Sequence, residues 1–372
     1  MSRYYQLALK RIKAIYDEIQ DVRGLPQNLL WVGRIPMVPA DDAEVMARFT
    51  GRILIADLIA DDQKGVVRAP QPIRLQETKI PNLKHGMKIT QEMLNLLRRI
   101  EGQIATRGDS QIFDNYIARS ILNLRDGVYQ RMEAIHNAML MDSFSYSKLG
   151  IVLSGVTWGM PSDLKVTIST AWSDTSNATP INDILAVMRV AKEKYGITLN
   201  RVTLTTTDFL EMVATTEFRN KAALYAQFVL PTAGTFPTND IATMQMLGSR
   251  MLNGAVIEIY DAQYWDESVY GVQTASNYLT AGKILLTNVQ ADNDPTMWDW
   301  ANAEVTEMVV ADMFGGSIIG MEEAGMENFR GPVGYATVGD VNLNPPGPIL
   351  WGAGRGFTRR HMEAVSACLT NP

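Results

Sequence analysis

The chain has 372 residues, of which 46% are hydrophobic and 20% charged, and its formal net charge at pH 7 is −6. This length exceeds one typical core and predicts two or more folding units. The acidic balance argues against a sequence-wide affinity for nucleic-acid phosphates, and the single cysteine, Cys368, excludes an intrachain disulfide. No stretch approaches the roughly 18 apolar residues of a membrane span, and the start lacks the apolar run of a signal peptide. We therefore expect a soluble protein that is made and used without secretion or membrane contact.

The first 50 residues predict an arm, not a core. Residues 2–22 have the spacing of an amphipathic helix. From Leu25 to about Arg48 the sequence is irregular and contains three prolines. This stretch is too apolar for a free linker, so we interpret residues 1–50 as an arm that lies across its own subunit or a neighbour.

Residues 51–90 predict a long two-stranded ribbon. A strand-like run begins at Ile53, a charged turn follows at 61–65, and a second extended segment carries Pro70 and Pro72. Prolines at such positions belong to edge strands, and a two-stranded ribbon alone is marginal in water. We therefore expect the ribbon to lean on a neighbouring subunit. The charged side chains that we expect to contact that neighbour are Asp61, Asp62, Lys64, Arg68 and Arg74.

The clearest single element is a helix predicted over residues 110–142. Its apolar side chains recur every three or four residues from Phe113 to Met139, which is one stripe on a helix. Polar side chains, among them Glu133 and Asn137, occupy the opposite face. At 1.5 Å per residue the helix would be about 45 Å long. We interpret it as the spine of an elongated molecule; a long helix in an ordinary bundle or a coiled-coil dimer is the alternative.

After this helix, alternating strands and helices predict an α/β or α+β domain between about residues 176 and 334. A polar stretch at 173–177 marks its start. Residues 335–372 are expected to return to the domain that holds the spine and to end in a strand within 362–370. The expected elements are strands near 149–153 and 164–169, a helix from Thr179-Pro180 to Tyr195-Gly196, a strand at 201–205, a helix capped by Thr207 or Asp208 that buries Phe209, Leu210 and Val213, mixed helix and loop at 217–250, and strands at 255–260 and 283–288.

No constellation of side chains predicts catalysis or a bound metal or cofactor. The three histidines, which include His136 and His361, lack the spacing of a metal site, and we interpret His136 as a packing or surface residue. Cys368 is expected to be a buried structural thiol, because His361 would lie roughly 23 Å away along an extended strand. The glycines of 352–356 lack the spacing of a dinucleotide loop and predict a flexible turn. We therefore expect no enzyme activity.

Several stretches follow, in order and in pattern, those of one known family: 79–103, 109–142, 201–221, 252–266, 278–291 and the ending HMEAVSACL. In these stretches the chain resembles the major capsid (head) proteins of tailed bacteriophages, specifically the lambda-type major head protein E family. The resemblance covers most of the chain. The charged ribbon tip at 61–65 and an excursion at 351–360 depart from the family's pattern.

The resemblance implies an α+β fold of the HK97 type. Its parts would be an N-terminal arm (1–50), an extended E-loop (51–90), a peripheral domain with the spine helix (91–175), an axial domain (176–334) and a return to the peripheral domain (335–372). An arm and a ribbon with little core of their own would find stability by packing on neighbouring subunits.

The same resemblance implies a structural role in a virion. Such subunits assemble as pentamers and hexamers, in the host cytoplasm, into an icosahedral shell that encloses double-stranded DNA without sequence-specific binding. The family implies scaffold, portal and decoration proteins as partners. An encapsulin-like nanocompartment shell, or a cytosolic enzyme of elongated α+β fold, is the alternative.

Overall fold

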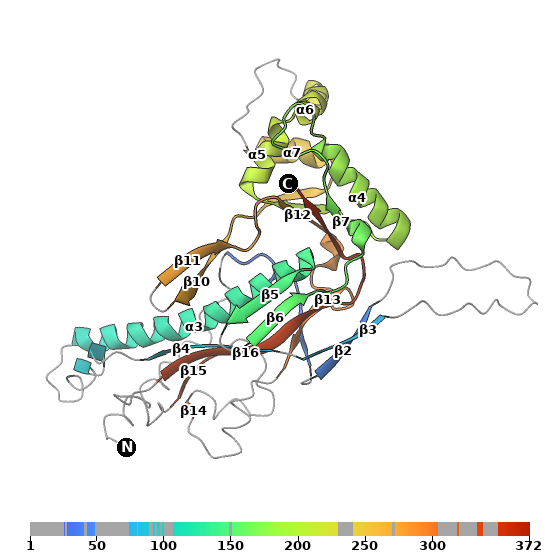
Figure 1. Ribbon diagram of the computed structural model, residues 1–372. Coiled ribbons are helices and arrows are strands. Elements are labelled where there is room, and N and C mark those ends of the chain that lie inside the picture. Colours follow the sequence, from blue (N-terminus) through green and yellow to red (C-terminus); the bar gives the residue numbers. More distant parts are fainter. Residues whose placement is uncertain are drawn as a thin grey trace, which may run out of the picture.

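The computed structural model describes residues 26, 28–40, 43–48, 74–79, 81–88, 92–93, 95–96, 99, 107–148, 151–229, 241–269, 272–303, 318–319, 333–337 and 349–372. The predicted helix at 2–22 and most of the predicted ribbon, including Asp61, Asp62, Lys64 and Arg68, lie outside these residues. The described part is an elongated molecule of mixed helix and sheet with two lobes (Figure 1). The lower lobe is built on helix α3 (Arg107–Met141), and the upper lobe contains the four shorter helices between residues 180 and 251.

The sheet of the lower lobe is organised around one long strand. Its six strands are β1 (Met37–Pro39), β4 (Asn82–Lys88), β13 (Trp298–Asn302), β14 (Ile318–Ile319), β15 (Val333–Thr337) and β16 (Ile349–Arg360). Strand β16 pairs with β13 along residues 356–360, and with β4 and β15 along its first part. The glycines of 352–356 therefore belong to a strand, and the predicted flexible turn is wrong. At Gly356 a Cβ atom would lie 2.1 Å from Trp300 Nε1, so this glycine makes room for a packed indole.

Helix α3 lies along this sheet and contacts β16 and β4 (Figure 1). It confirms the spine helix predicted at 110–142. The whole apolar stripe from Phe113 to Met139 is buried. On the opposite face Asn115 and Asn123 are exposed, whereas Glu133 and Asn137 are fully buried. The last turns of α3 are thus covered on both faces, which the spacing of apolar residues did not predict.

The upper lobe contains a five-stranded sheet flanked by helices. In spatial order its strands are β7 (Lys165–Thr167), β17 (Ser366–Thr370), β12 (Lys283–Thr287), β8 (Arg201–Leu204) and β9 (Val256–Ile259). The helices are α4 (Pro180–Tyr195), α5 (Thr206–Ala214), α6 (Thr216–Val229) and α7 (Ile241–Met251). Short 3-10 turns lie at Ser162–Leu164 and Val289–Ala291. Helix α4 follows Thr179 and ends at Gly196, whose φ is 72°, which confirms the predicted start and stop.

Three hairpins complete the described strands. They are β2 (Ala43–Arg48) with β3 (Arg74–Lys79), β5 (Phe144–Lys148) with β6 (Ile151–Val156), and β10 (Gln263–Val269) with β11 (Val272–Asn277). Each hairpin is an antiparallel two-stranded sheet among the residues that the structure describes. The β10–β11 hairpin projects from the upper lobe along the side of α3 in the view of Figure 1.

Two expectations about strand partners are wrong. Strand β17 was expected to return to the domain of the spine, but it pairs with β12 and β7 in the upper sheet. Strand β13 lies within the domain predicted at 176–334, and β15 begins at the end of that domain. Both strands nevertheless pair with β16 in the lower sheet. The pattern of apolar residues identifies a strand, but it does not say which distant strand will be its neighbour.

The start of α5 also differs from the prediction. Its cap is Thr205, whose hydroxyl accepts a hydrogen bond from Asp208 N at 3.2 Å, and not Thr207 or Asp208. Asp208 is buried and accepts a hydrogen bond from Gly282 N at 3.0 Å. Phe209 is buried as expected, but Leu210 is 50% exposed. A run of three threonines at 205–207 offers several possible caps, so the sequence alone does not decide which one is used.

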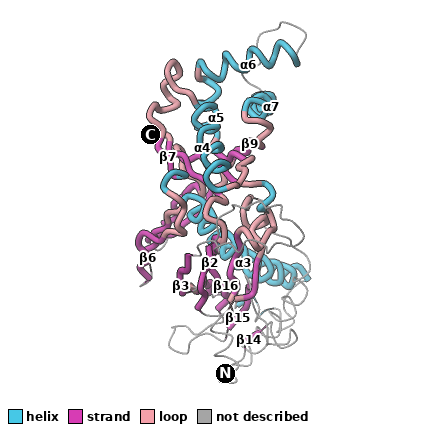
Figure 2. The backbone as a smooth tube through the Cα atoms, turned by 90° about the vertical axis from the view of Figure 1, so that its right-hand side faces the viewer, coloured by secondary structure: helices cyan, strands magenta, loops and turns pink. Residues whose placement is uncertain are grey.

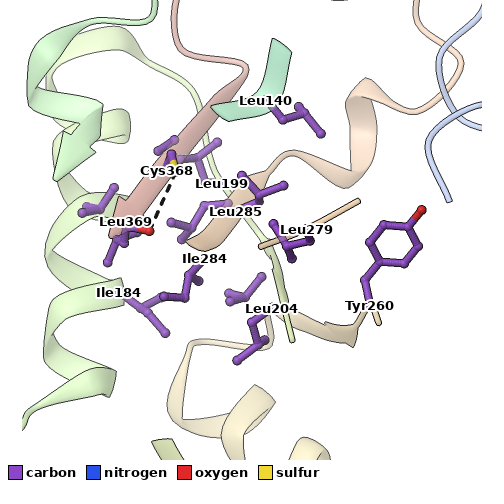
Figure 3. Close-up of a cluster of buried hydrophobic side chains, with 14 of the residues drawn as sticks. Leu140, Ile184, Leu199, Leu204, Tyr260, Leu279, Ile284, Leu285, Cys368 and Leu369 are labelled. Atoms are coloured by element: carbon purple, nitrogen blue, oxygen red, sulfur yellow. Dashed lines mark hydrogen bonds between the residues drawn. The ribbon is translucent and has the colours of Figure 1, made fainter. Parts of the chain in front are cut away.

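One apolar core is shared by the two lobes. The largest cluster of buried apolar side chains contains Leu140 of α3 together with Ile184 of α4 and Leu285 of β12. Figure 3 shows this region, with Ile184 facing the strands that carry Leu285 and Leu369. Each such buried side chain contributes about 1.5–3 kcal/mol. A shared core of this kind opposes independent movement of the lobes. None of the described helices combines the length and the apolar character that a bilayer crossing requires.

Ile121→Asp should prevent the formation of a stable subunit. Ile121 is 3% exposed in the stripe of α3, so aspartate there would bury an unpaired charge at a cost of about 4 kcal/mol or more. The matched control is Ile112→Asp, because Ile112 lies on the same helix and is 56% exposed. Soluble yield and denaturant unfolding should be close to wild type for the control and lost for Ile121→Asp. Equal behaviour of the two variants would contradict the packing of α3.

Candidate functional site

One group of polar contacts between the lobes surrounds a single buried carboxylate, and we call it the Glu133 joint (Leu30, Trp31, Val32, Glu133 and Tyr260). The backbone N–H groups of Leu30 and Trp31 each donate to Glu133 Oε1 at 3.0 Å. Those of Trp31 and Val32 donate to Oε2 at 2.9 Å. The Tyr260 hydroxyl donates to Oε1 at 2.6 Å. The N-terminal segment, helix α3 and the end of β9 therefore meet at a single side chain.

Burial dominates the electrostatics of this joint. Loss of water raises the pKa of the Glu133 carboxyl, while the hydrogen bonds from Tyr260 and from the three backbone N–H groups act in the opposite direction. Burial, and next the adjacent carboxylate, raise the pKa of Tyr260 far above its ordinary value. The phenol therefore keeps its proton and remains a donor. The joint is a structural network of buried hydrogen bonds.

An ion-pair cluster beside the joint ties the same parts together. Arg34 binds Glu258 of β9 through two hydrogen bonds of 2.7 and 2.8 Å. Arg201 of β8 binds Asp292 in the same two-point manner, at 2.8 and 2.5 Å. Asn293 N donates to Arg34 O at 2.6 Å. Such bidentate pairs fix orientation as well as distance, so they hold the N-terminal segment in register with the upper sheet.

A second polar contact lies between α3 and the lower sheet. His136 Nδ1 is 2.8 Å from the Thr358 hydroxyl of β16, and its ring meets Trp300 edge-on with centroids 5.3 Å apart. Burial lowers the pKa of His136 to about 3, so the ring is neutral. Trp158 Nε1 donates to Thr358 O at 2.7 Å. His136 is therefore a packing residue, one of the two roles predicted for it.

The candidate catalytic groups do not converge. Cys368 is buried, and its Sγ lies 3.8 Å from the carbonyl of Leu369 (Figure 3). Burial raises the pKa of the Cys368 thiol to about 11, so the group is a protonated structural thiol, as expected. His361 lies beside Asp299, at 3.2 Å. Within the described ranges, no three His, Cys, Asp or Glu residues are grouped to hold a metal ion.

The predicted contact residues are only partly placed by the structure. Asp61, Asp62, Lys64 and Arg68 lie outside the described residues. Arg74 opens β3 and is paired in register with Arg48 of β2. The part of the ribbon that is described thus begins as a hairpin with the N-terminal arm, and the proposed contact role of these five residues stays a prediction.

Several large apolar side chains of the upper lobe are exposed, among them Leu210, which was predicted to be buried. On it the exposed ones are Leu210, Leu224, Ile241, Met246, Val256 and Trp265. The periodicity of apolar residues misses such positions, because it assigns every apolar side chain to a core. The Glu133 joint was missed for the opposite reason, since a glutamate on the polar face of a helix is ordinarily read as solvated.

Comparisons with known proteins point in one direction. The model of the family described as phage major capsid protein E matches residues 40–309. No curated protein matches the chain. A crystal structure of a phage-related protein from Bordetella bronchiseptica RB50 is 12% identical over 96% of each chain, with a TM-score of 0.53. That of a putative prophage capsid protein from E. coli CFT073 is 13% identical, covers 98% of this chain and 99% of its own, and has a TM-score of 0.51. At such identities these two likenesses concern the fold, which is of the HK97 type.

Glu133→Gln should loosen the joint between the lobes. The amide NH₂ cannot accept the N–H donors that now meet one of the carboxylate oxygens, so at least one buried donor loses its acceptor. We expect a loss of about 2–3 kcal/mol in the free energy of unfolding, measured by denaturant unfolding of the subunit. Glu193→Gln on the exposed face of α4 is the control and should change stability by less than about 0.5 kcal/mol. Equal stabilities for both variants would mean that the joint contributes little.

Proposed function

We propose that this chain, which belongs to the phage major capsid protein E family and is a structural subunit of a capsid shell, assembles into pentamers and hexamers of identical copies. These capsomers would form an icosahedral head around double-stranded DNA. The observation that supports this most strongly is the extent of the family match, because residues 40–309 include α3 and most of the upper lobe, with Glu133 and Tyr260 among them. The role is architectural and not enzymatic, and the place of the protein is the virion.

The lobes provide a physical basis for the proposal. A shell subunit must hold its shape while its neighbours pull on it, and the shared core and the Glu133 joint supply that stiffness. Isolated two-stranded hairpins are marginal in water, and three hairpins of the described fold pair with no further described strand. Contacts with neighbouring copies would complete their burial.

We assign the parts of the fold accordingly. The lower lobe with α3 would be the peripheral domain, and the upper lobe would be the axial domain, which the last strand, β17, joins. Residues 51–90 would be the E-loop and residues 1–50 the arm. Asp61, Asp62, Lys64, Arg68 and Arg74 would then contact a neighbouring subunit, since charged side chains at the rim of a ribbon select its partner.

The partners of such a shell follow from its role. The subunit binds copies of itself, and scaffold, portal and decoration proteins would join it during assembly in the host cytoplasm. The DNA would be enclosed without sequence-specific contacts. A net charge of −6 supports this, because a container that bound phosphates tightly would oppose the packing and release of its contents.

Deletion of residues 58–68 should leave a soluble subunit and prevent shell formation, since this part of the ribbon would serve neighbours more than its own core. Electron microscopy of the purified protein, with and without the deletion, is the measurement. Wild-type protein should give shells, tubes or capsomer rings, and nucleic acid found inside would separate a phage head from a nanocompartment with protein cargo. Wild-type protein that stays a monomer or dimer under all assembly conditions would refute the proposal.

A further inference from the structure

A groove opens on one flank of the upper lobe. It lies between α4 and the segments that lead into β8 and β9, and its volume is about 750 Å³. Leu185, Met188 and Leu252 give it an apolar lining, and Arg189 and Lys192 are exposed at its rim. All residues that line the groove are described in the structure, and none of them is a carboxylate. The groove is therefore apolar inside and cationic at its edge.

A projecting tryptophan stands on the other flank of the molecule. Trp265 of β10 is 66% exposed, the highest value among the large apolar side chains that the structure describes. Its neighbour across the hairpin is Ala275 of β11, so a small side chain leaves the indole standing clear. The exposed Asp261 precedes the hairpin.

The hairpin is anchored on its inner face, so Trp265 is presented in a fixed position. Successive side chains of a strand point to opposite faces. The ring of Tyr264, the residue before Trp265, has its centroid 5.0 Å from that of Tyr278. The guanidinium of Arg131 on α3 lies 5.9 Å from the centroid of the same Tyr264 ring. Tyr264 thus fastens the hairpin to the body of the subunit, while Trp265 faces away from that anchor.

The two features are complementary in chemistry. An indole inserted beside Leu185 and Met188 would gain apolar burial and a sulfur–aromatic contact, and Arg189 at the rim suits the face of an aromatic ring. The exposed carboxylate of Asp261, at the base of the hairpin, would bring negative charge toward the cations of the rim. Tryptophan is among the residue types that are enriched at the dominant positions of protein interfaces.

The geometry points to a second copy of this chain as the occupant of the groove: we propose that Trp265 of one subunit docks in the α4 groove of the next. Helix α4 and the β10–β11 hairpin lie on opposite flanks in Figure 1, and in Figure 2, viewed from the side, α4 faces the reader. The two features of one subunit therefore cannot meet each other. A contact between unlike patches is repeated from copy to copy and closes a ring when the rotation allows it. This inference rests on the proposed function and names the surface that would close the capsomer.

Two complementary variants test the contact in solution. Trp265→Ala removes the inserted side chain and keeps the groove, whereas Ala186→Trp fills the groove from the exposed face of α4 and keeps Trp265. Each variant alone should associate about 30-fold more weakly than wild type in sedimentation velocity, the loss typical of a dominant interface residue. Leu224→Ala is the matched control, because Leu224 on α6 is 61% exposed and lies in neither patch; it should associate as wild type does.

Mixing the two variants in equal amounts separates contact from misfolding. The Ala186→Trp subunit still carries Trp265, and the Trp265→Ala subunit still carries an open groove, so one intact contact forms per mixed pair. We expect mixed dimers at wild-type affinity and no closed rings. Absence of mixed dimers, or full assembly by either variant alone, would overturn the proposed contact while leaving the capsid function in place. A wild-type protein that forms no rings or shells would refute both.

Discussion

Glu133 accepts hydrogen bonds from three consecutive backbone N–H groups and from a tyrosine hydroxyl at a site with no exposure to solvent. A buried N–H without an acceptor costs about 1–3 kcal/mol. The hydrogen bonds from three such N–H groups to Glu133 therefore hold the segment Leu30–Val32 on α3. Tyr260, at the end of β9, brings the upper lobe to the same carboxylate. This arrangement helps to fix the relative position of the lobes, and the ion pair of Arg34 with Glu258 of β9 connects the N-terminal segment to the upper lobe at a second place.

This stiffness distinguishes the interior of the subunit from its periphery. Inside, the lobes share one apolar core, and polar groups such as Glu133 and His136 are bonded within it. At the periphery the fold presents two-stranded hairpins, an open groove on α4 and the exposed Trp265. A subunit of this kind can bear forces from its neighbours with little change of shape, and its exposed apolar surfaces lie where neighbours can reach them. Those are the properties that a shell requires of its repeating unit.

Local features of the fold could be predicted from the sequence because local physics determines them. The stripe from Phe113 to Met139 requires a helix with one buried face, and Pro180 and Gly196 bound a helix by their backbone preferences. Long-range features could not be predicted. The partner of β17, the burial of Glu133 and the extended glycines of β16 all depend on which distant segments meet. The exposed Trp265 was missed because periodicity treats every apolar side chain as core, and the contact residues of the predicted ribbon lie mostly outside the described structure.

A cryo-electron microscopy reconstruction of the assembled protein, at a resolution that shows side chains, tests the central claim most directly. The account predicts rings of this subunit in which every copy keeps Leu30–Val32 bonded to Glu133, with lobes in the same relative position and neighbours in contact through unlike flanks. A map in which the N-terminal segment has left α3, or in which copies meet only as two-fold pairs through identical flanks, would contradict it.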